Sequence, residues 1–301
     1  MKTLIVILGP TASGKTAFSI QIARWLNTEI MNADSRQFYK GLNIGTAKPG
    51  QDELNLVPHH FIDSLSPEQD YSVGKFEEEG IALLNSLFEN HDQVLMTGGS
   101  GLYIQAICQG LDQLPAADPL LRETLQKELD LHGIEVLQKK LATLDPEYYA
   151  TVDKANPHRL IRALEVCIQS GEKYSSLRKF KHQVRSFNII KIGLMPEKEL
   201  LYERINKRVD QMIQDGLVEE ARSFKHLQHL NALQTVGYRE LFRYFNNEIS
   251  LETAIEEIKK NTRRYAKRQS TWFRKDETIH WFNPEEPETI IKFLRSSLKL
   301  T

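Results

Sequence analysis

The sequence predicts an α/β fold, with a parallel sheet at its core and a helical insertion. Three observations carry this prediction. Apolar runs typical of buried strands alternate with segments of helical periodicity. The first run leads into a glycine-rich loop and then directly into a helical pattern. From about Leu120 to Tyr174 the chain shows amphipathic helical patterns and no convincing strand. Alternating strands and helices favour a parallel sheet that binds ligands at the carboxyl ends of its strands.

The expected elements of the sheet follow one another in order. A buried strand is predicted for TLIVIL at 3–8, and the helix after it for TAFSIQIARWL at 16–26. A second strand is expected in TEIMNADS at 28–35, where it ends in polar residues. A third is expected in QVLMTGGSGLYIQAI at 93–107, which turns through glycines into another helix. The sheet resumes with FNIIKIGLM at 187–195, and the rest of the chain is expected to be helical.

The change of pattern after the third strand predicts two domains. A catalytic core is expected from residues 1–115 and 187–301, with a helical insertion domain at 116–186. One helix of the insertion is well delimited, because Asn156 suits its N-cap and Gly171 follows its last periodic residue.

Composition places the chain among ordinary globular proteins. Of its 301 residues, 41% are hydrophobic and 26% are charged, so a sizeable core is expected and disorder is not. Cys108 and Cys167 are the two cysteines and lie far apart, which gives no support to a disulfide framework or a cysteine zinc site. The opening apolar run is too short for a membrane span or a signal peptide. We therefore expect a cytoplasmic protein without a membrane partner.

The charge is nearly balanced overall but not locally. The formal net charge is −1, yet the run KNTRRYAKRQSTWFRK from Lys260 to Lys275 contains no acidic residue. Arg264, Lys267 and Arg268 recur there at helical spacing, which favours a surface that binds nucleic acid over a merely solvated helix face.

The stretch GPTASGKT has the spacing of a phosphate-binding loop. Backbone N–H groups in such a loop converge on phosphate oxygens, Lys15 adds a positive charge, and the Thr16 hydroxyl can ligate Mg²⁺. Because a strand and a helix flank the motif in the required order, a P-loop NTPase-like core is favoured over a chance match on a surface turn. The residues expected to hold phosphate are Gly9, Pro10, Thr11, Ala12, Ser13, Gly14, Lys15 and Thr16.

Other polar residues are candidates for the same site. Asp34 lies where the second strand should end, although an Asp there can also simply close a turn. Arg204 and Arg208 are four residues apart on one helix face and can close over phosphates, or can be solvated or paired with acids such as Glu203. The adjacent pair His59 and His60 lacks a third ligand at suitable spacing, so no metal site is expected from it.

Seven motifs resemble those of the tRNA dimethylallyltransferases, also called tRNA isopentenyltransferases. They are GPTASGKT, NADSRQFYKGLNIGTAKP, PHHFID, GGSGLYI, NPHRLIRALEV, VGYREL and AKRQSTWFR, and together they span residues 9–274. No cysteine follows Cys167, so the zinc finger of eukaryotic members is not expected and the chain resembles the compact bacterial type.

The resemblance implies that the loop holds the diphosphate of dimethylallyl diphosphate and that the allyl group passes to N6 of the adenosine 3′ to the anticodon. Asp34 would then be the base. Lys15, the N–H groups of the loop and a Mg²⁺ ion on Thr16 would stabilise the leaving diphosphate. Ser100, where many members carry Thr, would contact the diphosphate or the adenine, unless it only caps the next helix.

The resemblance also implies contacts with the tRNA anticodon arm. The alternative is that Arg159 and Arg162 form a solvated face and that Trp272 and Phe273 are core residues, which for Phe273 is the favoured interpretation. The residues implied in tRNA binding are Asp34, Ser35, Arg36, Gln37, Ser100, Arg122, His158, Arg159, Leu160, Ile161, Arg162, Val236, Gly237, Tyr238, Arg239, Lys267, Arg268, Gln269, Ser270, Thr271, Trp272, Phe273 and Arg274. We expect the protein to be a monomer.

Three other functions are compatible with parts of the sequence. Allyl transfer to free adenine nucleotides would use the same fold, but a mononucleotide needs neither the insertion nor the basic helix. A small-molecule kinase would place ATP at the loop. A non-catalytic RNA-binding module would leave Lys15, Thr16 and Asp34 without a purpose.

Overall fold

The computed structural model describes residues 2–179 and 183–299. The chain divides into two compact units, one formed by Met1–Cys108 with Arg185–Thr301 and the other by Gln109–Val184. Within the residues described, no helix combines the length and the apolar composition needed to cross a membrane.

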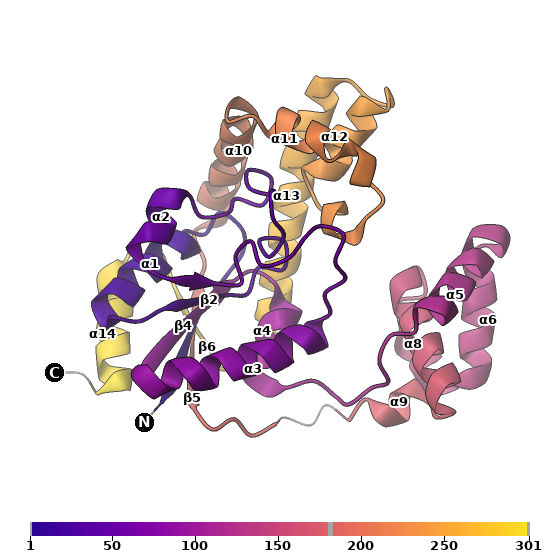
Figure 1. Cartoon of the computed structure of the whole chain (residues 1–301), viewed down its shortest axis with the longest axis horizontal. Helices are drawn as coiled ribbons and strands as arrows, with labels where there is room; N and C mark the ends of the chain where they lie inside the picture. Colours follow the sequence, from indigo (N-terminus) through magenta and orange to yellow (C-terminus); the bar gives the residue numbers. More distant parts are fainter. Residues whose placement is uncertain (1, 180–182, 300–301) are drawn as a thin grey trace. The chain divides into compact units, whose positions relative to one another are not determined.

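A six-stranded, fully parallel sheet forms the centre of the first unit (Figure 1). Its spatial order is β3-β2-β4-β1-β5-β6. The central strand β1 pairs with β4 on one side and with β5 on the other, and Thr3 lies opposite both Gln93 and Asn188. The parallel α/β sheet predicted from the sequence is therefore confirmed. The strands are β1 (Thr3–Leu8), β2 (Ile30–Asn32), β3 (His59–His60), β4 (Gln93–Gly98), β5 (Asn188–Leu194) and β6 (Ile279–Phe282).

Two strands depart from the sequence prediction. β3 has two residues and makes the run at 93–107 the fourth strand rather than the third. β6 follows the basic helix and pairs in parallel with β5, so the expectation of a wholly helical C-terminal part was wrong. Both strands lie at the edges of the sheet and are short, which leaves too few residues for a recognisable period.

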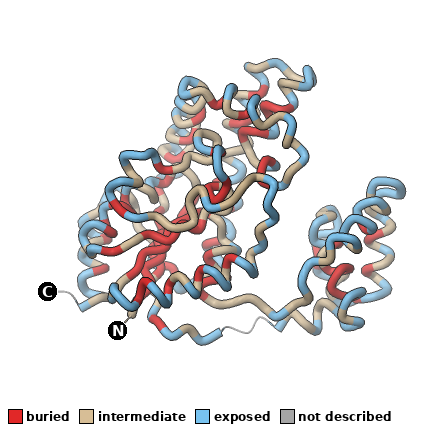
Figure 2. Tube along the Cα trace, in the orientation of Figure 1, coloured by how far each residue is buried: buried red, intermediate tan, exposed pale blue. Residues whose placement is uncertain are grey.

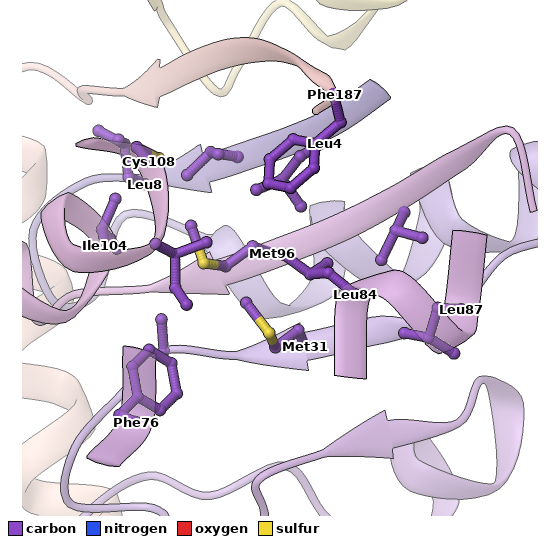
Figure 3. Close-up of a cluster of buried hydrophobic side chains, with 14 of the residues drawn as sticks. Leu4, Leu8, Met31, Phe76, Leu84, Leu87, Met96, Ile104, Cys108 and Phe187 are labelled. Carbon is purple, nitrogen blue, oxygen red and sulfur yellow. The ribbon is translucent and has the colours of Figure 1, made fainter. Parts of the chain in front are cut away.

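Helices cover both faces of the sheet. Side chains of β1 alternate between the faces, because successive residues of a strand point to opposite sides. On one face, Leu4 and Leu8 pack with side chains of α3 (Val73–Asn90) and α4 (Gly101–Gln109), and Figure 3 shows Phe76, Met31 and Met96 in this cluster. On the other face, β1 packs against α1 and α14. The helices α1 and α14 span Lys15–Leu26 and Pro287–Leu298.

Four further helices extend the first unit beyond the carboxyl ends of the strands (Figure 1). Val209, Tyr238, Leu241 and Ile258 meet in a separate hydrophobic core of this region. The helices are α10 (Lys198–Gln214), α11 (Leu217–Ser223), α12 (Tyr238–Phe245) and α13 (Leu251–Phe273), with short turns η1 (Lys225–Leu227) and η2 (Asn231–Leu233) between α11 and α12. The short helix α2 (Gln51–Leu56) lies between β2 and β3 along the chain.

The secondary structure described in the second unit is helical, and the unit has its own core, as the buried segments in Figure 2 show. Its helices are α5 (Pro119–His132), α6 (Ile134–Leu144), α7 (Pro146–Thr151), α8 (Pro157–Ser170) and α9 (Tyr174–Leu177). The predicted limits of α8 are confirmed. Asn156 Oδ1 accepts a hydrogen bond from the Arg159 amide at 3.2 Å, and Gly171 follows the helix in the left-handed region with φ of 70°.

Candidate active site

The loop after β1 has the backbone that a phosphate cradle needs. A Cβ atom at Gly9 would lie 2.4 Å from the Leu194 carbonyl oxygen of β5, so only glycine fits there. Ala12 and Gly14 have positive φ angles of 64° and 88°, and α1 then begins at Lys15. The loop therefore meets the positive end of a helix, the arrangement that stabilises bound phosphate.

A cavity of about 360 Å³ opens beside this loop in the first unit. It brings together Lys15, the first residue of α1, and Asp34, which follows β2. Arg208 of α10 lines the same cavity. Other predicted residues in its lining are Thr11, Ala12, Ser13, Gly14, Thr16, Arg36, Gln37, Val236, Gly237 and Gln269.

Charges in the cavity shift one another's proton affinity. Burial lowers the pKa of Lys15 to about 8; the Asp34 carboxylate opposes this shift and the Arg208 guanidinium adds to it. The Lys15 ammonium donates to the Pro10 carbonyl at 2.7 Å. Burial raises the pKa of Asp34, against the opposing effects of the Arg36 amide, which donates to Asp34 Oδ1 at 3.1 Å, and of Lys15. The site thus holds a carboxylate that is more basic than usual, which suits proton acceptance.

Ser100 fixes the turn that carries Asp34. Its Oγ accepts a hydrogen bond from the Ser35 amide at 3.0 Å and lies 3.1 Å from Ser35 Oγ. In the part of the chain that the structure describes, this hydroxyl makes no bond to an amide of α4. The Ser100 carbonyl accepts the Ile104 amide at 3.1 Å, so Ser100 occupies the N-cap position of α4 while its hydroxyl bonds to the Ser35 turn.

The two arginines of α10 have different environments. Arg204 Nη2 lies 2.5 Å from Glu285 Oε1, so this arginine is paired at the surface. Arg208 Nη1 donates to Thr11 Oγ1 at 3.1 Å, which places its guanidinium at the phosphate loop. Burial lowers the pKa of Arg208, while Asp34 opposes that shift. Arg208 alone of the pair belongs to the cavity.

Glu220 shapes the site and was missed by the sequence analysis. Its carboxylate accepts hydrogen bonds from the amides of Asn43, Ile44 and Gly45 at 3.0, 2.8 and 2.9 Å. It also accepts one from the Tyr238 hydroxyl at 2.6 Å. These bonds hold the segment 43–47, part of which lines the cavity. No local sequence signal marks Glu220, because its backbone partners at 43–45 lie 175 or more residues away along the chain and Tyr238 lies 18 residues away.

The residues expected to contact tRNA separate into exposed and buried sets. His158, Arg159, Arg239, Lys267, Arg268, Thr271, Trp272 and Arg274 are exposed. Leu160, Ile161, Tyr238, Gln269 and Phe273 are at most 6% exposed. The buried side chains pack in the interior instead of presenting a surface to RNA, and for Phe273 the core interpretation is confirmed. Ser270 is half-buried and donates to the Ala266 carbonyl.

The exposed face of α13 is basic and uncompensated. Within residues 2–179 and 183–299, no carboxylate lies within 4.0 Å of Arg264, Lys267, Arg268 or Arg274. By contrast, Arg243 of α12 pairs with two glutamates. Unpaired cations on one helix face create the positive potential that attracts a phosphate backbone.

In the second unit, a buried glutamate organises two of the predicted arginines. Glu165 is fully buried and accepts from Arg122 Nη2 and Arg162 Nη1, both at 2.8 Å. It also accepts from the Asp118 amide at 2.9 Å. Arg162 is thus paired rather than freely solvated, whereas Arg159 stays exposed.

The oxygen donors near the loop suit a phosphate-bound magnesium ion. Thr16 lines the cavity, and the nearby Ser13 hydroxyl is buried with no hydrogen-bond partner among the residues that the structure describes. Among the described residues, no group of three His, Cys, Asp or Glu side chains is placed to hold a metal. Mg²⁺ commonly keeps water and phosphate ligands and takes one or two from protein, which matches this donor set.

Comparisons with known proteins point to one family. Residues 37–276 match the family model described as IPP transferase. A tRNA dimethylallyltransferase of Christiangramia forsetii is 55% identical, and the match covers 98% of each chain.

The solved structures that resemble this chain point to the same family. The full-length tRNA isopentenylpyrophosphate transferase of Bacillus halodurans is 35% identical, with a TM-score of 0.74 over 99% of this chain and 97% of that one. A eukaryotic dimethylallyltransferase acting on tRNA is 26% identical, with a TM-score of 0.75 over 91% of this chain and 70% of that one. This chain therefore belongs to the IPP transferase family.

Proposed function

We propose that this protein transfers the dimethylallyl group of dimethylallyl diphosphate to N6 of the adenosine on the 3′ side of the anticodon in tRNA. The single observation that carries the proposal is the placement of Lys15 and Asp34 in one cavity, where each can act on one end of the same displacement. Family membership and the relatives named for this activity support the choice of substrates.

The reaction has one bond forming and one breaking. The adenine N6 attacks C1 of the allyl group, and the bond from C1 to the diphosphate oxygen breaks with its electron pair. The proton released from N6 passes to the Asp34 carboxylate, whose raised pKa suits that transfer. Lys15, the amides of the phosphate loop and Arg208 neutralise the charge that gathers on the leaving diphosphate.

Magnesium fits this scheme as a partner of the diphosphate. The Thr16 hydroxyl would hold Mg²⁺ at the loop. When bound, the ion withdraws negative charge from the leaving group. The remaining contribution of the protein is to orient the two substrates and to hold the proton acceptor.

The exposed basic residues supply the RNA contacts in this proposal. Phosphates of the anticodon arm would be bound by Lys267 and Arg268 of α13 and by Arg274 directly after this helix. Trp272, which is 42% exposed, offers an aromatic face for a base that has left its stack. In the second unit we assign tRNA contacts to His158 and Arg159, with Arg122 and Arg162 oriented by Glu165.

A tRNA substrate and two buried free cysteines support action in the cytoplasm, and we propose a monomer as the active form.

Labelled dimethylallyl diphosphate tests the function. The protein is incubated with the labelled donor and either unmodified tRNA or free adenine nucleotides, with and without Mg²⁺. Magnesium-dependent label in tRNA, at the adenosine after the anticodon, is the expected result. Label found only in free nucleotides would show that the acceptor is a mononucleotide and not tRNA. ATP consumption without any prenyl transfer would indicate a kinase.

A further inference from the structure

Gln269 lies in the basic run of α13, yet its side chain faces inward and is 6% exposed. Its Oε1 accepts a hydrogen bond from the Thr11 amide at 2.9 Å. Its Nε2 donates to the Gly99 carbonyl, also at 2.9 Å. One buried amide therefore joins two loops, the phosphate loop after β1 and the turn after β4.

The packing around the second loop leaves no room for a side chain at either of its glycines, Gly99 and Gly101. A Cβ atom at Gly99 would lie 2.4 Å from Gln269 Nε2, and one at Gly101 would lie 2.3 Å from Trp272 Nε1 and Cδ1. Gln269 and Trp272 are three residues apart, so one face of α13 packs on this turn. The turn carries Ser100 between the two glycines.

The phosphate loop is held by the same helix and by α10. Gln269 binds the backbone of Thr11, and Arg208 binds its hydroxyl at 3.1 Å. An amide that donates to Gln269 cannot also donate to a phosphate. The bond therefore sets the direction in which the loop backbone faces, and with it the set of amides available to the ligand.

We propose that Gln269 is a positioning residue for diphosphate binding, which holds the phosphate loop against the turn that carries Ser100. In this role it acts through Thr11 and makes no contact with tRNA, unlike the exposed Lys267 and Arg268 that precede it. The proposal rests on the proposed function to the extent that a diphosphate occupies the loop.

Two substitutions separate the two bonds of the amide. Gln269→Leu has a similar size and removes both. Gln269→Glu keeps an acceptor for the Thr11 amide, loses the donor to Gly99 and adds a negative charge near the bound anion, and it serves as the second variant if the leucine protein unfolds. Binding of inorganic pyrophosphate with Mg²⁺ is measured by calorimetry, without tRNA and without turnover.

We expect Gln269→Leu and Gln269→Glu each to weaken pyrophosphate binding and to raise KM for the allyl donor by about tenfold or more. The Kd for tRNA should change less than about twofold in both variants, because the side chain is buried.

Thr28→Val provides the matched control. Thr28 is equally buried, at 6%, and its hydroxyl donates to the Gln93 carbonyl at 2.5 Å, at the amino end of the strands. This variant loses a buried hydrogen bond away from the cavity, so it should unfold more readily and bind pyrophosphate normally. Thermal unfolding of each variant shows whether the binding change follows from lost stability.

Two results would overturn the proposal. One is a higher tRNA Kd in Gln269→Leu with normal pyrophosphate binding, which would make Gln269 an RNA contact. The other is an equal loss of pyrophosphate binding in Thr28→Val. Weakened pyrophosphate binding in Gln269→Leu, in a protein that prenylates no tRNA, would refute the proposed function and leave this inference standing.

Discussion

Arg208 donates a hydrogen bond to the hydroxyl of Thr11 at 3.1 Å, although 197 residues separate the two along the chain. The contact places one guanidinium of α10 at the phosphate loop, beside Lys15 and Asp34. Its neighbour one turn away, Arg204, binds Glu285 at the surface instead. Two arginines that look equivalent in the sequence therefore have different roles in the structure.

Arg208→Ala should lower kcat/KM for the allyl donor by about 10²-fold, because a buried cation that stabilises the leaving diphosphate is lost. Arg204→Ala removes a surface ion pair and should stay within about twofold of the wild type. Steady-state kinetics with saturating tRNA measures both. Equal losses of kcat/KM in the two variants would contradict the assignment of Arg208, and not Arg204, to the cavity.

Asp34→Asn should keep tRNA binding and lose turnover by about 10²-fold or more, since the amide cannot accept the proton. Asn can still accept the Arg36 amide, so the turn is preserved. In the wild type, the single-turnover rate should fall as the pH drops through the raised pKa of Asp34, because the carboxyl is then protonated. This acidic limb should be absent in Asp34→Asn. Wild-type turnover in that variant would remove Asp34 as the base.

Lys15 should titrate near pH 8 in the ligand-free protein, well below the ordinary range of lysine. Because the Asp34 carboxylate opposes this depression, Asp34→Asn should move the Lys15 midpoint lower still. Bound pyrophosphate should move it higher, since an anion favours the charged ammonium. Carbon NMR of labelled lysine Cε atoms follows the titration. A titration midpoint near 10.5 for Lys15 in the ligand-free protein would show that its ammonium group is not desolvated.

Lys267→Ala and Arg268→Ala should each weaken tRNA binding and reduce the slope of log K against log salt by about 1, as expected for one lost phosphate contact. Arg243→Ala is the control, because that arginine is already paired with Glu248 and Glu257. Filter binding at several salt concentrations gives the slopes. An unchanged slope in both α13 variants would exclude this face from RNA binding.

Glu220→Gln should lower the free energy of unfolding by about 1–3 kcal/mol and raise KM for the allyl donor, because the segment 43–47 loses charged acceptors for its amides. Glu219→Gln, at the exposed neighbouring position, should change neither quantity. Chemical denaturation and initial rates test the pair. A normal KM in a clearly destabilised Glu220→Gln would show that the segment does not shape the donor site.

The sequence predicted the parts of the structure that depend on short-range signals. The phosphate loop was recognisable because glycines, lysine and threonine must stand at fixed spacing between a strand and a helix. The helix Pro157–Ser170 was delimited correctly because a cap and a terminal glycine act on adjacent backbone.

Features that depend on distant partners were not predictable. Gln269 resembles one more polar residue in a basic run, and its burial follows from contacts with Thr11 and Gly99, which lie 258 and 170 residues away. Glu220 gives no local signal for the same reason. The strand Ile279–Phe282 is short and lies at an edge, so its pairing with β5 rather than its own pattern defines it.

The position of β1 in the sheet has a consequence for biosynthesis. It pairs with β4 from the same N-terminal part, but its other neighbour, β5, comes after the helical unit along the chain. While the ribosome is still making residues 99–187, one side of β1 therefore has backbone amides and carbonyls with no strand to pair with, a state that invites association with other nascent chains. Rapid independent folding of the helical unit would shorten that interval.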